Sequence, residues 1–78
     1  MPNNAYDDIM SGNKDNNIRF SDLRYVLDSH GFGCRIKGDH YIYFRNDILE
    51  IINIQPDGKM AKPYQIRQVR RLFENYHI

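Results

Sequence analysis

The chain has 78 residues, with 11 lysines and arginines against 10 aspartates and glutamates, for a net charge of +1. A single domain of this size buries only about 60% of the surface that its unfolded chain exposes, so we expect a partner to complement it. The lone cysteine, Cys34, excludes an internal disulfide, and no apolar run is long enough for a signal peptide or a membrane span. These observations predict a cytoplasmic protein in which Cys34 is a small strand residue.

The positive charge gathers near the C-terminal end. Residues 1–57 carry nine acids and six bases, whereas residues 58–78 carry five bases and one acid, Glu74. The two segments therefore have charges of −3 and +4. A local positive field attracts polyanions, although the solvated face of a helix explains the same pattern.

The first 19 residues read as a polar, asparagine-rich extension that holds one short helix around Tyr6 to Met10. Ser11 and Gly12 would end that helix. We expect Ile9 and Met10 to cover one edge of the core. The domain proper is predicted over residues 20–78.

The first main helix is predicted from Asp22 to about Ser29. Ser21 is an N-cap type of residue, and Phe20 and Tyr25 stand at the spacing of a hydrophobic staple. An apolar stripe repeats at helical spacing while other positions are left to face water; the stripe is Leu23, Val26 and Leu27, and the water-facing positions are Arg24 and Asp28.

The same helix has a clear stop signal. Gly31 is the expected left-handed C′ residue, and Phe32 after it is expected to fold back on Leu27, as in a Schellman motif. His30, at the helix end, is interpreted as structural or exposed.

Three strands follow, over residues 33–37, 41–45 and 48–54, and form a meander. Asn46 and Asp47 connect the last two strands, and because both residue types tolerate positive φ, they predict a tight antiparallel hairpin. The third strand is apolar on both parities, which predicts a central strand or one covered on both faces.

Side chains alternate along the second strand. Ile42 and Phe44 are expected on one face, and Tyr41, Tyr43 and Arg45 on the other. His40 shares the parity of Ile42, so it either caps the edge of the core or escapes burial because the strand has only begun.

A second main helix is predicted from Pro63 to Tyr76, since proline suits the first helical turn. Its apolar face is lined by Ile66, Val69, Leu72, Phe73 and Tyr76. Three arginines project from another face, and two lysines precede the helix, an arrangement that favours phosphate; they are Arg67, Arg70 and Arg71, and Lys59 and Lys62. The element order predicts an α+β domain with the αβββα order of the double-stranded-RNA-binding fold, its main helices on one face of the sheet.

His40 is the candidate catalytic residue because Gly38 allows the backbone to bend just before the strand, so that Asp39 and His40 are presented at a rim. His77 is interpreted as a tail residue. No histidine has a second histidine or a cysteine at the short spacing of a zinc site, so we expect neither a metal nor another cofactor.

Several fragments together resemble the HicA toxin family of prokaryotic toxin-antitoxin systems, over about residues 18–78. They are His30-Gly31-Phe32, the segment from Lys37 to Tyr43 (KGDHYIY), the strand EIINIQP at residues 50–56, and the stretch GKMAKPYQIRQVR at residues 58–70. The family usually shows Gly-Ser-His-His followed by an aliphatic and an aromatic residue.

Carried over by position, the family's catalytic histidine falls on His40. Two departures stand beside it. Asp39 occupies a position where serine or threonine is common, which adds a negative charge near an incoming phosphate. Tyr41 replaces a second histidine, which removes a second proton donor.

The resemblance implies an mRNA-cleaving endoribonuclease, a toxin that arrests translation and growth and is covered by a HicB-like antitoxin protein. The chemistry needs no metal, because RNA supplies its own 2′-hydroxyl nucleophile and a histidine serves as base or acid near neutral pH. Cations and aromatic rings would hold the RNA, and the candidates are Lys37, Lys59, Lys62, Arg67, Arg70 and Arg71, with Tyr41 and Tyr43 for stacking.

Two alternatives belong to other classes of protein. One is a non-catalytic RNA-binding module of the same fold, in which Asp39 and Tyr41 mark the loss of activity. The other is a protein-interaction module whose exposed tyrosines and arginines form an interface.

Overall fold

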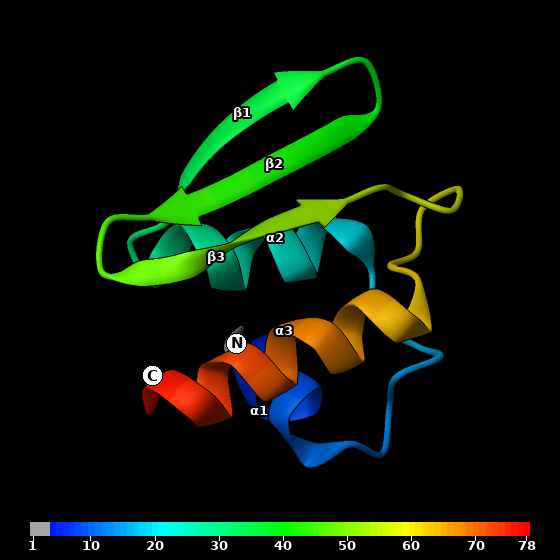
Figure 1. The fold of residues 1–78 in the computed structure, drawn as a ribbon. Helices are drawn as coiled ribbons and strands as arrows, with labels where there is room; N and C mark the ends of the chain where they lie inside the picture. Colours follow the sequence, from blue (N-terminus) through cyan, green and yellow to red (C-terminus); the bar gives the residue numbers. More distant parts are fainter. Residues whose placement is uncertain (1–3) are drawn as a thin grey trace.

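The computed structural model describes residues 4–78 and has the α+β layout that the sequence predicts (Figure 1). The helices are α1 (Asn4–Ser11), α2 (Phe20–Ser29) and α3 (Pro63–Tyr76), and the strands are β1 (Gly33–Lys37), β2 (His40–Arg45) and β3 (Ile48–Ile54). The strands form one antiparallel sheet in the order β1-β2-β3. The predicted meander is confirmed.

Two short hairpins join the strands. Gly38 and Asp39 connect the paired residues Lys37 and His40, and Gly38 has a φ of +62°. Glycine at the first of two turn positions suits a type II′ turn, which matches the twist of the flanking strands. This turn brings His40 into β2, one residue earlier than predicted.

The second hairpin departs from expectation in its backbone. Asn46 and Asp47 do connect the paired residues Arg45 and Ile48, but neither connecting residue has a positive φ. Instead the pairing is irregular between Tyr43 and Arg45, and the Arg45 guanidinium donates to Asp47 at 2.7 Å and 2.9 Å. The predicted tight antiparallel hairpin is therefore confirmed, but without positive φ, and an ion pair and a strand irregularity accompany it.

The predicted start of α2 is wrong. The helix begins at Phe20, its N-cap residue is Arg19, and no side chain caps it. Phe20 donates its backbone N–H to the Lys59 carbonyl at 2.9 Å and is itself buried, so a tertiary bond takes the place of the Ser21 cap. Tyr25 is 58% exposed and forms no staple.

The stop of α2 is confirmed. Gly31 has a φ of +83°, and Phe32 donates its N–H to the Leu27 carbonyl at 3.2 Å, the long bond of a Schellman motif. His30 is structural, since its Nδ1 lies 2.8 Å from the Val26 carbonyl and its ring stacks on Tyr6 with 5.1 Å between centroids.

Residues 4–19 contribute to the same core as the rest of the domain. Helix α1 packs against α2 and α3, and Ile9 and Ile18 are buried. Tyr6 donates its hydroxyl to the Ile78 carbonyl at 2.8 Å. In Figure 1, α2 and α3 lie on one side of the sheet, so within the described residues 4–78 its other face has no helix over it.

The expectation that β3 is central or covered on both faces is wrong. It is an edge strand, and Leu49 and Ile51 are 91% and 62% exposed. Helix α3 runs beside its free edge, where Tyr76 Oη accepts the Leu49 N–H at 3.2 Å and donates to Glu50 at 2.6 Å.

The buried Gln65 makes a matching contact at the other end of the same edge. Its Oε1 accepts the backbone N–H of Gln55 at 3.2 Å. Helix α3 therefore lies antiparallel to β3, with its first turn near the end of the strand and its last turn near the start. Within residues 4–78 no helix is long and apolar enough to cross a membrane.

Candidate functional site

Strand β2 divides its side chains between two different environments. Tyr41 and Tyr43 face the helices, and Tyr43 is fully buried. The alternate positions from His40 to Phe44, with their neighbours on β1 and β3, form what we call the outer face, which is made of Arg35, Lys37, His40, Ile42, Phe44, Ile51 and Asn53. His40 therefore escapes burial and lies on the face that no helix covers.

The His40 ring is half-exposed and held from one side. Its Nδ1 lies 3.2 Å from Oδ1 of Asn53 on the neighbouring strand, and 49% of its side chain is open to solvent. An amide oxygen only accepts hydrogen bonds, so this contact is a hydrogen bond in the tautomer of the ring that carries its proton on Nδ1. The lone pair on Nε2 is then free to take a proton.

The Asp39 carboxylate lies next to the His40 ring. Its Oδ1 lies 3.8 Å from His40 Nε2, and its Oδ2 accepts a hydrogen bond from Gln55 Nε2 at 3.0 Å. The Gln55 bond, aided by the charges of His40 and Lys62, keeps the pKa of the Asp39 carboxyl below its usual range. Asp39 is thus an anion beside the His40 ring.

Two of the predicted RNA-binding cations lie near His40 and Asp39. Lys37 is directly opposite His40 in the β1–β2 pairing and is exposed. Lys62 is the N-cap residue of α3, and its charge acts on Asp39. The structure therefore gathers His40, Asp39, Lys37 and Lys62 with the side chains of Asn53 and Gln55.

Tyr43 is not available to stack a base, contrary to the prediction. It lies in the core, where its hydroxyl accepts a hydrogen bond from Arg24 Nε at 2.8 Å. Burial raises the pKa of Tyr43 to about 12. The same contact overturns the expectation that Arg24 is left to face water.

Tyr41 is two residues from Tyr43 in β2, so its side chain points to the same inner face, where it is half-buried. The Arg24 guanidinium lies 4.6 Å from its ring centroid, and Phe20 packs edge-on at 5.0 Å. Both contacts occupy the ring, so Tyr41 is a packing residue here. A histidine at this position would not share the face of His40.

Arg70 is also removed from the predicted RNA-binding set. It pairs with Asp15 through two bonds of 2.8 Å and 3.0 Å and donates to the Ile9 carbonyl at 2.9 Å. Only 17% of its side chain is exposed. The Arg70 guanidinium therefore attaches residues 9–15 to α3 and is already paired with a carboxylate.

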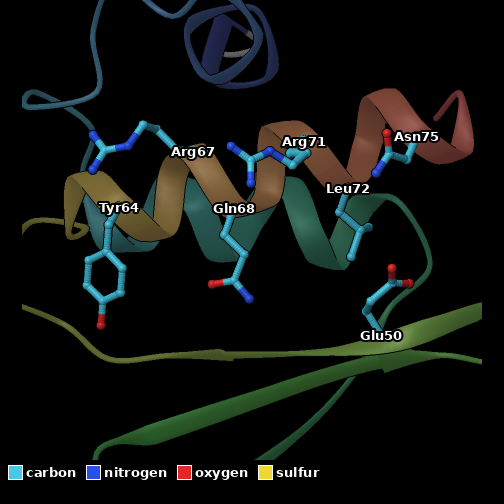
Figure 2. Close-up of a pocket in the computed structure, with 7 residues that line it drawn as sticks. All are labelled: Glu50, Tyr64, Arg67, Gln68, Arg71, Leu72 and Asn75. Atoms are coloured by element: carbon cyan, nitrogen blue, oxygen red, sulfur yellow. The ribbon is translucent and has the colours of Figure 1, made fainter.

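Arg67 and Arg71 lie elsewhere than His40. They line a groove of about 320 Å³ between α3 and β3, with Glu50 on its far wall. Figure 2 shows Tyr64, Gln68 and Leu72 pointing from α3 toward the strands, whereas the two arginines do not point that way. Lys59 lies in a third place, a hollow that also contains Tyr41 and Phe20. The predicted cations thus divide among three regions.

Sequence reasoning missed Asn53 and Gln55. Both belong to the segment predicted as the third strand and its end, and the pairing of Ile42 with Asn53 places the amide one step from His40. That register depends on the irregular second hairpin, so the strand pattern alone did not indicate it. Among residues 4–78, no group of three or more His, Cys, Asp and Glu side chains is arranged to hold a metal.

Comparison with known proteins gives no relative for this chain: no family model matches it, and no curated protein or solved structure matches it either.

Proposed function

We propose that this protein is a metal-independent endoribonuclease that cleaves mRNA, the toxin of a toxin-antitoxin pair, with a fold of the double-stranded-RNA-binding type. The observation that carries the proposal is the half-exposed His40 on the uncovered face of the sheet, oriented by Asn53 and opposite Lys37. The resemblance of residues 37–43 to the HicA motif supports the same assignment.

The proposed reaction uses the nucleophile of the substrate. Nε2 of His40 takes the proton from a ribose 2′-hydroxyl, and the 2′-oxygen attacks the adjacent phosphorus. The bond from phosphorus to the 5′-oxygen breaks, leaving a 2′,3′-cyclic phosphate on one product. The departing 5′-oxygen takes a proton from water, and His40 releases its proton to solvent. One general base of this kind contributes about 10²- to 10⁴-fold in rate.

The groups around the ring have distinct roles in this proposal. Asn53 fixes the ring orientation and keeps the Nδ1 proton in place. Asp39, 3.8 Å from Nε2, stabilises the imidazolium that forms. Lys37 supplies a positive charge for the phosphate, and Lys62 offsets the negative charge of Asp39.

Expression of the chain alone in bacteria tests the proposal. The wild type is expected to arrest growth and deplete transcripts, and His40→Ala is expected to abolish both effects. His77→Asn is the matched control, because His77 is an exposed histidine with a φ of +58°, a conformation that asparagine tolerates. It should behave as the wild type does.

The other outcomes point to the other classes of protein. Growth arrest that persists in His40→Ala without transcript loss would identify a non-catalytic RNA-binding module. Absence of both effects in the wild type would favour a protein-interaction module.

An antitoxin is part of the same proposal. Lys37, Arg67 and Arg71 are exposed cations, and their positive charge would attract an acidic protein of the HicB kind. Co-expression with the product of the neighbouring gene should restore growth, and the two proteins should purify together.

A further inference from the structure

We infer that single-stranded RNA crosses the outer face of the sheet, with the Phe44 ring as a platform for one base and Arg35 and Lys37 as contacts for its phosphates. This inference rests on the proposed function and extends it from the reacting group to the path of the substrate. It assigns a role to Phe44 and Arg35, neither of which belongs to the catalytic group.

The position of the Phe44 ring is the first support. Phe44 pairs with Gly33 on β1, and a Cβ atom added to Gly33 would lie 2.8 Å from two carbons of the ring. The ring therefore covers the glycine and is held against the sheet, yet the residue is still 38% exposed. An aromatic ring held in this way, with no helix above it, is suited to stacking an unpaired base.

The charge of the outer face is the second support. Arg35 extends its guanidinium to 5.8 Å from the Phe44 ring centroid, and Lys37 follows on the same strand beside His40. No outward strand position on this face carries an acid, and among residues 4–78 no carboxylate is within ion-pair distance of either cation. A row of unpaired cations next to an aromatic ring complements a polyanion with bases rather than an apolar protein surface.

The distance between Phe44 and His40 along β2 indicates which nucleotide would stack on the Phe44 ring. His40, Ile42 and Phe44 alternate along one strand, which rises about 3.3 Å per residue, so His40 and Phe44 are about 13 Å apart. A base stacked on Phe44 would therefore belong to a different nucleotide from the one that is cleaved. Phe44 is a positioning residue in this arrangement.

Binding of a single-stranded RNA oligonucleotide tests the inference, measured by fluorescence anisotropy in the His40→Ala background so that the RNA stays intact. Phe44→Leu keeps an apolar strand residue but removes the ring, and is expected to weaken affinity at least about fivefold. Phe44→Tyr should restore affinity. Tyr25→Leu is the control, because Tyr25 is a comparably exposed ring on α2.

Salt dependence tests the cations separately. Arg35→Gln and Lys37→Gln should each reduce the slope of log K against log salt by about 0.7, the value for one contact to a single strand. Lys14→Gln is the control, since Lys14 follows α1 on the helical side and pairs with Asp8 at 3.5 Å. Its slope should equal that of the parent.

The outcomes separate this inference from the proposed function. Unchanged affinity in Phe44→Leu and unchanged slopes in both cation variants, with circular dichroism unaltered, would overturn the RNA path even if His40-dependent cleavage is observed. The expected binding losses without any cleavage by the wild type would support the path and refute the nuclease. A change in self-association of Phe44→Leu with RNA affinity intact would mark a protein interface instead and overturn the inference.

Discussion

The two faces of β2 carry similar residues but have different environments. On the inner face, Tyr43 is sealed beneath α2 and its hydroxyl is taken by Arg24. On the outer face, Phe44 and His40 remain open, and His40 has one amide contact and a free nitrogen. The alternation of a single strand therefore separates the residues that stabilise the fold from those available to a ligand.

The largest expected effect on stability comes from the two aromatic neighbours. Tyr43→Ala should lower the free energy of unfolding by about 3–5 kcal/mol, because it leaves a cavity and an unpaired Arg24 donor. Phe44→Ala should cost less than half as much, since its ring is partly in solvent already. Urea unfolding of both variants measures the difference. Equal losses would mean that the outer face is covered in solution.

A second contrast concerns two arginines of α3. Arg70→Gln should destabilise the protein by about 1.5–3 kcal/mol, because Asp15 loses its charged partner in a site where its side chain is only 15% exposed. Arg67→Gln should stay within about 0.5 kcal/mol, as is usual for an exposed position. Urea unfolding at neutral pH compares them, and equal effects would contradict the assignment of Arg70 to the ion pair that attaches residues 9–15 to α3.

The ion pair between Arg70 and Asp15 predicts that the free energy of unfolding depends on pH. The hydrogen bond from Arg70 holds the pKa of Asp15 below its ordinary value, so the stabilisation is present above that value and is lost as the pH falls through the lowered one. The stability gap between the wild type and Arg70→Gln should therefore narrow below about pH 4. Repeating the unfolding series in acid measures it, and a gap independent of pH would exclude the ion pair as the cause.

A smaller effect is expected from Asn53, which contacts the His40 ring and orients it in the proposed reaction. Asn53→Ala should slow RNA cleavage about fivefold, the worth of one neutral hydrogen bond of about 1 kcal/mol. Asn53→Gln, which keeps the amide on a longer side chain, should recover part of the rate. A loss equal to that of His40→Ala would show that Asn53 does more than orient the ring.

The smallest effect tests whether the outer face of β3 is open to solvent. Leu49 is 91% exposed, so Leu49→Ser should change the free energy of unfolding by less than about 0.5 kcal/mol. Ile52→Ser, on the buried side of the same strand, is the contrast and should unfold far more readily. A large loss in Leu49→Ser would mean that this face of the strand is covered in solution.

The sequence predicted the elements well because their signals are local. Gly31 ended α2, Pro63 began α3, and β1, β3 and α3 have the predicted bounds. The errors came from contacts between distant segments. The start of α2 depends on a bond from Phe20 to Lys59, and the charge of Arg70 is taken by Asp15, 55 residues away.

The candidate site was predicted in part for the same reason. His40 and Lys37 flank one short turn, so their proximity follows from the hairpin. The face on which His40 lies depends on which parity of β2 meets the helices. Ile42 and Phe44 are more apolar than Tyr41 and Tyr43, yet the tyrosines are on the face that meets the helices, so the apolar character of the side chains did not indicate the inner face. Burial of Tyr43 required the partner Arg24, which the helix pattern assigned to solvent.

Cleavage of a defined single-stranded RNA by the purified protein, in the presence of a chelator, tests the central role of His40 most directly. The wild type is expected to produce fragments that end in a 2′,3′-cyclic phosphate, and a substrate blocked by 2′-O-methylation should stay intact. His40→Ala should be about 10²- to 10⁴-fold slower while keeping the unfolding midpoint of the wild type. A His40→Ala protein that is folded and cleaves at the wild-type rate would contradict the account.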